Sequence, residues 1–192
     1  MPTPLPIRII VWLWLIAALV VGRLELLNRL PGPALQGILI VLTGALLACY
    51  LKARGFRAWI DGLDLRALVL LHVTRFVGVY FLLLYNRGEL PYAFAVPGGW
   101  GDITVATLAL LICVVPLKAS IRPHAIAIWN VIGLVDILLV VVTAGRLGFE
   151  DMRQMRALTY LPLSLLPTFL VPLLIATHLM LYLRLRAKAL PQ

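Results

Sequence analysis

The sequence predicts an all-α fold, a polytopic membrane bundle of about six transmembrane helices, because its apolar runs are long enough to span a bilayer. Of the 192 residues, 62% are hydrophobic and only 13% are charged, whereas soluble domains are about 45–50% apolar. The runs are unbroken rather than alternating, and about 20 such residues cross the hydrocarbon as a helix. They fill the chain, so we expect a single transmembrane domain over residues 1–192.

The predicted spans follow the apolar runs in order. We expect them at residues 7–23, 33–52, 66–85, 98–117, 126–144 and 161–184. The first run follows Arg8 in the manner of a signal peptide, but no A-x-A-like cleavage site follows it. It is also long enough to span, so we interpret it as an uncleaved first helix.

Two connectors are polar, and one is apolar. Residues 53–65 mix basic, acidic and aromatic side chains, which is typical of a segment lying in the membrane interface. Residues 145–159 are rich in charge and predict a surface connector. Residues 88–97 are apolar and suggest a lid or a re-entrant loop. The last span contains Pro162, Pro167 and Pro172, which predict a kink.

The net charge of +9 is explained by topology rather than by nucleic-acid binding, because the basic residues lie mostly between apolar runs. One set would lie on the cytoplasmic side: Arg8, Lys52, Arg54, Arg57, Arg66, Lys118, Arg122, Arg184, Arg186 and Lys188. The opposite side would hold six other arginines: Arg23, Arg29, Arg87, Arg146, Arg153 and Arg156. Both termini are therefore expected in the cytoplasm, and the basic side would meet anionic lipid.

Arg75 and Asp136 are the most informative residues, because each is a charge inside an apolar run. An arginine at a helix centre costs about 2.5–3.5 kcal/mol on insertion scales, so it needs a partner. At about 1.5 Å of rise per residue, both residues lie about halfway across a core of about 30 Å. They are predicted to form an ion pair. The pair is either a lock between two helices or a substrate, ion or proton site.

Three further polar residues lie toward the cytoplasmic side of that pair. His72 is one helical turn from Arg75, and His178 in the last span reaches a similar depth. Asn130 lies nearer the cytoplasmic end of the fifth span. We favour interhelical hydrogen bonding for the two histidines. The alternative is axial ligation of a b-type haem, which needs two histidines at one depth on facing helices.

Asp102 ends the motif Gly98-Gly-Trp-Gly-Asp102 at the predicted outer end of the fourth span. We favour a helix N-cap for this residue. An anion site at the helix start is the alternative, although a carboxylate there would repel an anion. A cation site at the outer mouth also stays open. The histidines have no metal-ligand spacing, so no metal is predicted.

Three segments resemble those of uncharacterised bacterial multi-pass membrane proteins. They are His72-Val-Thr-Arg75, the stretch from Leu90-Pro91 to Asp102, and Trp129-Asn-Val-Ile-Gly-Leu-Val-Asp136. The resemblance covers about half of the chain, from the third to the fifth span, and implies a helical membrane fold. It carries no activity, substrate or cofactor.

These observations lead to three functional hypotheses. The first is a small transport, proton-conducting or accessory subunit of the bacterial inner membrane. There Arg75 would bind an anionic group or hold Asp136 ionised, and Asp136 would be the exchangeable partner. The second is an electron-transfer subunit with haem b between His72 and His178. The third is an enzyme acting on a lipid with residues 88–97 as a lid, although recognised catalytic motifs are absent from the sequence, so its catalytic residues are unknown. The expected partners are the lipid bilayer and other membrane subunits or a second copy, without nucleic acid.

Overall fold

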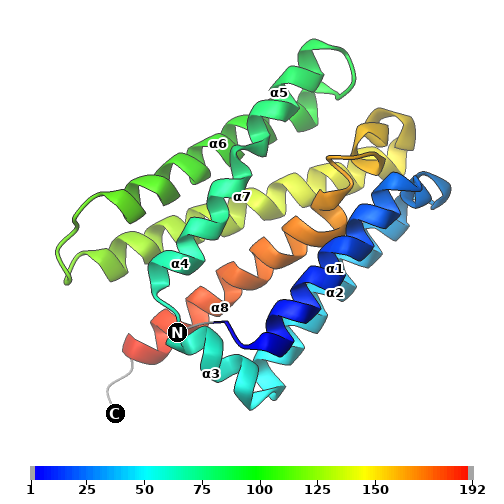
Figure 1. The fold of residues 1–192 in the computed structure, drawn as a ribbon. Coiled ribbons are helices and arrows are strands. Elements are labelled where there is room, and N and C mark those ends of the chain that lie inside the picture. The colour runs from blue at the N-terminus through cyan, green and yellow to red at the C-terminus, as the bar shows by residue number, and fades with distance from the viewer. Residues whose placement is uncertain (1–2, 190–192) are drawn as a thin grey trace. The chain divides into compact units, whose positions relative to one another are not determined.

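A computed structural model describes residues 3–189, and within this range the chain is helical with no strand. Six helical stretches are long and apolar enough to cross a membrane. They are Leu5–Arg23, Pro33–Lys52, Leu65–Asn86, Tyr92–Val114, Arg122–Glu150 and Leu166–Ala187. The predicted all-α fold class with about six candidate membrane spans is therefore confirmed (Figure 1).

Backbone contacts group the described residues into two units. The first unit comprises Met1–Gly62 and Val141–Ala176, and the second comprises Leu63–Val140 and Thr177–Gln192. Two helices, α7 (Arg122–Glu150) and α8 (Val171–Ala189), contribute residues to both units.

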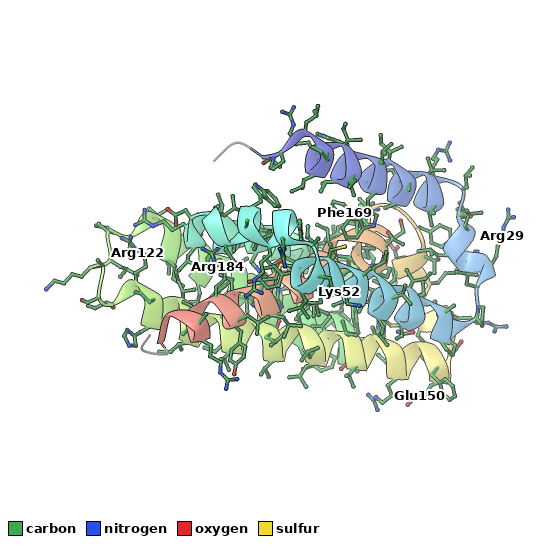
Figure 2. The ribbon with its side chains drawn as sticks, turned by 90° about the horizontal axis from the view of Figure 1, so that it is seen from below. Arg29, Lys52, Arg122, Glu150, Phe169 and Arg184 are labelled. Atoms are coloured by element: carbon green, nitrogen blue, oxygen red, sulfur yellow. The ribbon has the colours of Figure 1, made fainter. Side chains whose placement is uncertain are left out.

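The first unit contains the N-terminal helices and two short segments from later in the chain. In order they are α1 (Leu5–Arg23), η1 (Leu26–Arg29), α2 (Gly32–Lys52), α3 (Arg54–Gly62), η3 (Met152–Thr159) and η4 (Leu166–Leu170). Figure 2 shows the side chains of Arg29 and Lys52 near the two ends of α2. Short amphipathic α3 buries Ile60 and pairs Arg57 with Asp61 at 3.5 Å on its exposed face. A location of this segment in the membrane interface stays a prediction.

The last span is irregular where its prolines fall. The segment η4 is a π-helix, and regular α-helix begins only at Val171. Proline removes a backbone donor, so nearby carbonyls need other partners. The Thr168 hydroxyl donates to the Ser164 carbonyl at 2.7 Å, and the Trp14 indole donates to the Thr168 carbonyl at 2.8 Å. Where the prolines predict an irregular last span, the structure has a π-helical turn. Side chains of Thr168 and Trp14 donate hydrogen bonds to its nearby carbonyls.

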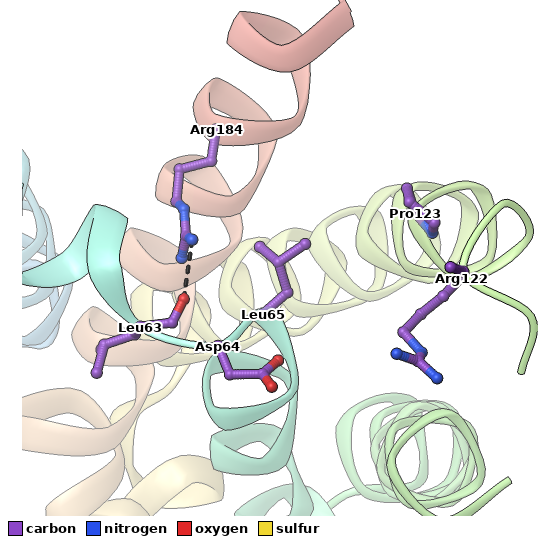
Figure 3. A pocket seen from close by; sticks show the side chains of 7 residues that line it. Leu63, Asp64, Leu65, Arg122, Pro123 and Arg184 are labelled. Carbon is purple, nitrogen blue, oxygen red and sulfur yellow. Dashed lines mark hydrogen bonds between the residues drawn. The ribbon is translucent and has the colours of Figure 1, made fainter. Parts of the chain in front are cut away.

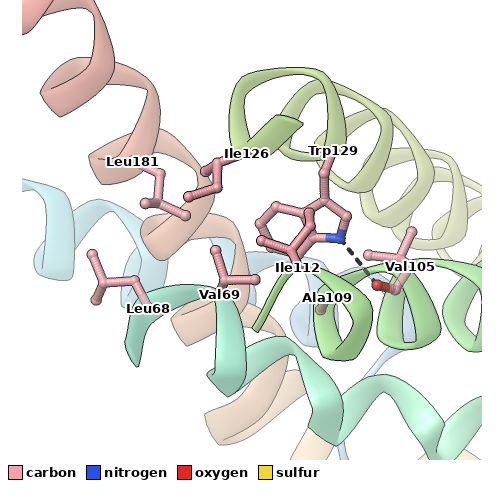
Figure 4. Packing of buried hydrophobic residues seen from close by; sticks show 8 residues of the cluster. All are labelled: Leu68, Val69, Val105, Ala109, Ile112, Ile126, Trp129 and Leu181. Carbon is pink, nitrogen blue, oxygen red and sulfur yellow. Dashed lines mark hydrogen bonds between the residues drawn. The ribbon is translucent and has the colours of Figure 1, made fainter. Parts of the chain in front are cut away.

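The second unit contains α4 (Leu65–Leu70), η2 (Leu71–Val77), α5 (Gly78–Asn86) and α6 (Tyr92–Val114). The α4–η2–α5 span packs along α6. Buried apolar residues of this unit pack into one core cluster (Figure 4), whose buried members are Leu68, Val69, Val105, Ala109, Ile112, Ile126, Trp129 and Leu181. The Trp129 indole donates to the Val105 carbonyl at 3.0 Å, so its one polar atom is satisfied within the core.

Two predicted helix boundaries, the start of α6 and the end of α7, are wrong. Residues 92–97 are the first turns of α6 rather than a lid or a re-entrant loop, because the helix begins directly after Pro91. Glycine and proline are tolerated inside transmembrane helices, so Pro97 and the glycines that follow it do not end α6. Similarly, α7 continues to Glu150, so only the part of 145–159 after that residue is a connector.

Candidate functional site

From Val69 to Leu84, the third span buries every third residue. Its middle segment, η2, is a 3₁₀-helix, in which residues i and i+3 lie on the same side. The residues buried at this spacing are Val69, His72, Arg75, Gly78, Phe81 and Leu84. This geometry places His72 and Arg75 on the interior face of the span, one turn apart.

Arg75 is held by two carboxylates and one backbone carbonyl. Its side chain is only 1% exposed. The Nε atom donates to Asp102 Oδ1 at 2.6 Å, and Nη1 donates to the Gly133 carbonyl at 2.9 Å. The Nη2 atom donates to Asp136 Oδ2. The predicted Arg75–Asp136 ion pair is therefore present, and Asp102 is a second acid. We call Arg75, Asp102 and Asp136 the Arg75 triad.

The prediction that Asp102 is a helix N-cap is wrong, because the N-cap of α6 (Tyr92–Val114) is Pro91. Asp102 instead lies well inside α6 and is 6% exposed. The glycines around it explain how it reaches Arg75. A Cβ atom on Gly78 would collide with the Gly99 carbonyl, so the two backbones of α5 and α6 are in direct contact at this point. The Gly98-Gly-Trp-Gly motif thus permits close helix approach rather than forming a loop.

Gly101 contributes to the same close packing. A Cβ atom there would overlap the Asp136 carboxylate, so only glycine leaves room for Asp136 beside α6. Asp136 is the less buried of the two acids, with 20% of its side chain exposed against 8% for Asp102. The two carboxylates therefore differ in exposure. They also come from different helices, Asp102 from α6 and Asp136 from α7.

A second polar group, the imidazole cluster, consists of His72, His178, Trp129 and Asn130. The two imidazole ring centroids are 4.1 Å apart, and the Trp129 ring lies 4.9 Å from His72 and 5.3 Å from His178. Both histidines are 0% exposed. The residues predicted to share a layer on one side of the Arg75–Asp136 pair are therefore brought together.

Asn130 fixes the orientation of His178. Its amide nitrogen donates to the His178 carbonyl at 3.1 Å, so its oxygen faces His178 Nδ1 at 2.9 Å. An amide oxygen only accepts, so Nδ1 carries the hydrogen and Nε2 of the neutral ring carries the lone pair. In the part of the chain that the structure describes, this Nε2 and both ring nitrogens of His72 are buried without a hydrogen-bond partner.

This arrangement does not fit haem between the two histidines. Axial ligands must face each other across a porphyrin and its iron, whereas these rings are in contact with each other and with Trp129. Among residues 3–189, no group of three or more His, Cys, Asp or Glu side chains is placed to hold a metal ion. The two histidines come from different helices, η2 and α8, and contact each other directly.

A family model described as a domain of unknown function, DUF8737, matches residues 32–186. The chain belongs to the DUF8737 family. The matched region contains the whole Arg75 triad and the whole imidazole cluster. Comparisons with curated proteins and with solved structures yield no match.

The charge balance of the triad defines what this DUF8737 site can do. One guanidinium faces two carboxylates, so with both acids ionised the site carries one uncompensated negative charge. At 4 Å and an effective dielectric constant of 20, two unit charges interact by about 4 kcal/mol. With one of the two carboxylates protonated, the three side chains would together be neutral, and charges buried without compensation are costly.

Proposed function

We propose that this DUF8737 protein is a small proton-conducting unit of the membrane, with the Arg75 triad as its working site. The observation that carries the proposal is the second carboxylate. A structural lock needs one acid for one arginine, whereas Asp102 and Asp136 both bind Arg75. The additional acid gives the site a place for one exchangeable proton.

The contacts suggest a different role for each member of the triad. All three nitrogens of the Arg75 guanidinium are engaged, two with carboxylates and one with Gly133, so it acts as a fixed positive charge. Arg75 is therefore better suited to hold the two acids in position than to bind an anionic substrate. Asp136 is the better candidate for proton exchange, because its side chain is more exposed than that of Asp102.

The imidazole cluster continues the proposed path. A neutral imidazole can accept a proton at one nitrogen and release one from the other. His178 has its lone pair on a buried Nε2 atom with no partner in the described residues, and His72 lies against it. His72 is also one 3₁₀ turn from Arg75, so the two groups are adjacent on one span.

Close packing supports a proton rather than a larger substrate. At Gly78 and Gly101 the site leaves no space even for a methyl group. A proton that crosses this point would therefore move along the side-chain groups themselves.

The basic residues of the sequence support cytoplasmic termini and a place in the bacterial inner membrane.

Proton flux into proteoliposomes tests this proposal. The full chain is reconstituted with a pH-sensitive dye inside, and a potassium diffusion potential drives proton entry. We expect the native protein to conduct above the rate of empty vesicles and Asp136→Asn to fall to that rate. Glu150→Gln is the matched control, because Glu150 is 54% exposed, pairs with Arg146 at 3.9 Å and makes no contact with the Arg75 triad among the described ion pairs. Equal flux through Asp136→Asn and the native protein would reject the proposal.

A further inference from the structure

A separate basic pocket lies within the second unit, where the start of α4 meets the start of α7 and the C-terminal part of α8 (Figure 3). It has a volume of about 300 Å³. Its lining combines two arginines, one acid and four apolar residues: Leu63, Asp64, Leu65, Ala119, Arg122, Pro123 and Arg184. This feature is independent of the Arg75 triad and of the proposed proton conduction.

Two backbone carbonyls hold the arginines in place. Arg122 Nη2 donates to the Leu117 carbonyl at 2.7 Å, and Arg184 Nη2 donates to the Leu63 carbonyl at 2.9 Å. Figure 3 shows both side chains extending from separate helices toward the turn at the start of α4. A guanidinium has five N–H donors, so Arg122 keeps donors beyond the single bond to Leu117. An arginine fixed in this way is suited to bind phosphate oxygens.

Asp64 is the one acid of the pocket. Its carboxylate accepts a hydrogen bond from the Arg66 backbone nitrogen at 2.8 Å and caps α4. Two arginines and one carboxylate line the pocket, so basic groups outnumber acidic ones among its lining residues. The pocket therefore attracts a singly charged anion more readily than a cation.

We propose that this pocket binds the phosphate group of an anionic phospholipid. The ends of transmembrane helices lie at headgroup depth, and basic pockets between such helices bind anionic headgroups. A lipid fits better than free phosphate because four of the lining residues are apolar. Exposed apolar residues also adjoin the pocket along the chain, with Val114 72% exposed and Ile121 50% exposed, and they offer a surface for acyl chains.

Lipid titration of the purified, delipidated full chain, followed by native mass spectrometry, tests the assignment. We expect dioleoyl-phosphatidylglycerol to bind more tightly than dioleoyl-phosphatidylcholine. Arg122→Gln should weaken phosphatidylglycerol binding by about tenfold, because it removes a charge-assisted contact, and Arg122→Lys should restore part of it. Arg57→Gln is the control, since Arg57 is an exposed arginine outside the pocket.

A second variant keeps the test valid if Arg122→Gln fails to fold. Ala119→Phe retains every charge but narrows the pocket, and it should also weaken phosphatidylglycerol binding. Equal weakening by Arg57→Gln would overturn the proposal, because it would indicate general charge attraction. Equal binding of the two lipids would overturn it as well. Calorimetry with inorganic phosphate distinguishes the source: phosphate binding without a preference for phosphatidylglycerol would refute the lipid assignment.

Discussion

Replacing Arg75 by methionine should destabilise the protein strongly, because it leaves two carboxylates in the membrane spans without their cation. Interhelical hydrogen bonds in membrane proteins average only about 0.6 kcal/mol, so three neutral bonds would be worth about 2 kcal/mol. Two of the three bonds of Arg75 join full charges, and such bonds are worth about 1.5–3 kcal/mol each. We therefore expect Arg75→Met to lower the free energy of unfolding by about 3–5 kcal/mol, the range for breaking a buried ion pair.

Reversible unfolding in a detergent–SDS titration, followed by circular dichroism, measures this difference. Arg146→Met is the matched control, since the Arg146 side chain is 62% exposed and pairs with Glu150 at 3.9 Å. An exposed pair contributes about 0–1 kcal/mol, so the control should unfold close to the native protein. A loss below about 1 kcal/mol for Arg75→Met would refute the conclusion that the triad is a buried ion network.

The triad should also be replaceable as a whole. A buried ion cluster replaced by apolar residues of similar volume is often neutral or stabilising. The triple variant Arg75→Met, Asp102→Leu, Asp136→Leu should therefore regain most of the stability that Arg75→Met loses. The same titration checks this result, and a triple variant less stable than Arg75→Met would contradict it.

Two other contacts give further predictions, measured by the same titration. Gly78→Ala should cost about 1–3 kcal/mol, the usual cost of overpacking, because its Cβ would meet the Gly99 carbonyl; Gly37→Ala, with nothing within 4 Å, should be neutral or stabilising. Asn130→Leu should cost about 1–3 kcal/mol, because it leaves His178 Nδ1 buried without a partner and removes the second hydrogen bond to the His178 carbonyl. A stable Gly78→Ala variant would contradict the backbone contact between α5 and α6, and an unchanged Asn130→Leu variant would contradict the role of Asn130.

The fold class follows from the sequence because lipid imposes a simple rule. A span must satisfy its backbone internally, so long apolar runs become helices. Depth alone also predicts the Arg75–Asp136 pair, since the two charges lie at similar heights on different spans. The layer of His72, His178 and Asn130 is predicted by the same reasoning.

The role of Asp102 is not predicted because its surroundings resemble a loop. Glycine and proline are breakers in water, but in lipid they remain inside helices, so α6 begins at Tyr92 and carries Asp102 into the interior. The position of Pro91 directly before an apolar run is the signal that places the helix start correctly. The 3₁₀ segment that aligns His72 with Arg75 has no comparable signal, because local sequence does not distinguish it from an α-helix.

Proton flux through the triple variant tests the central claim most directly. If the Arg75 triad is the working site, Arg75→Met, Asp102→Leu, Asp136→Leu folds, reconstitutes and conducts no faster than empty vesicles, while the native protein conducts above them. If the triple variant folds and conducts as the native protein does, the triad is a structural lock and the proposed function is wrong.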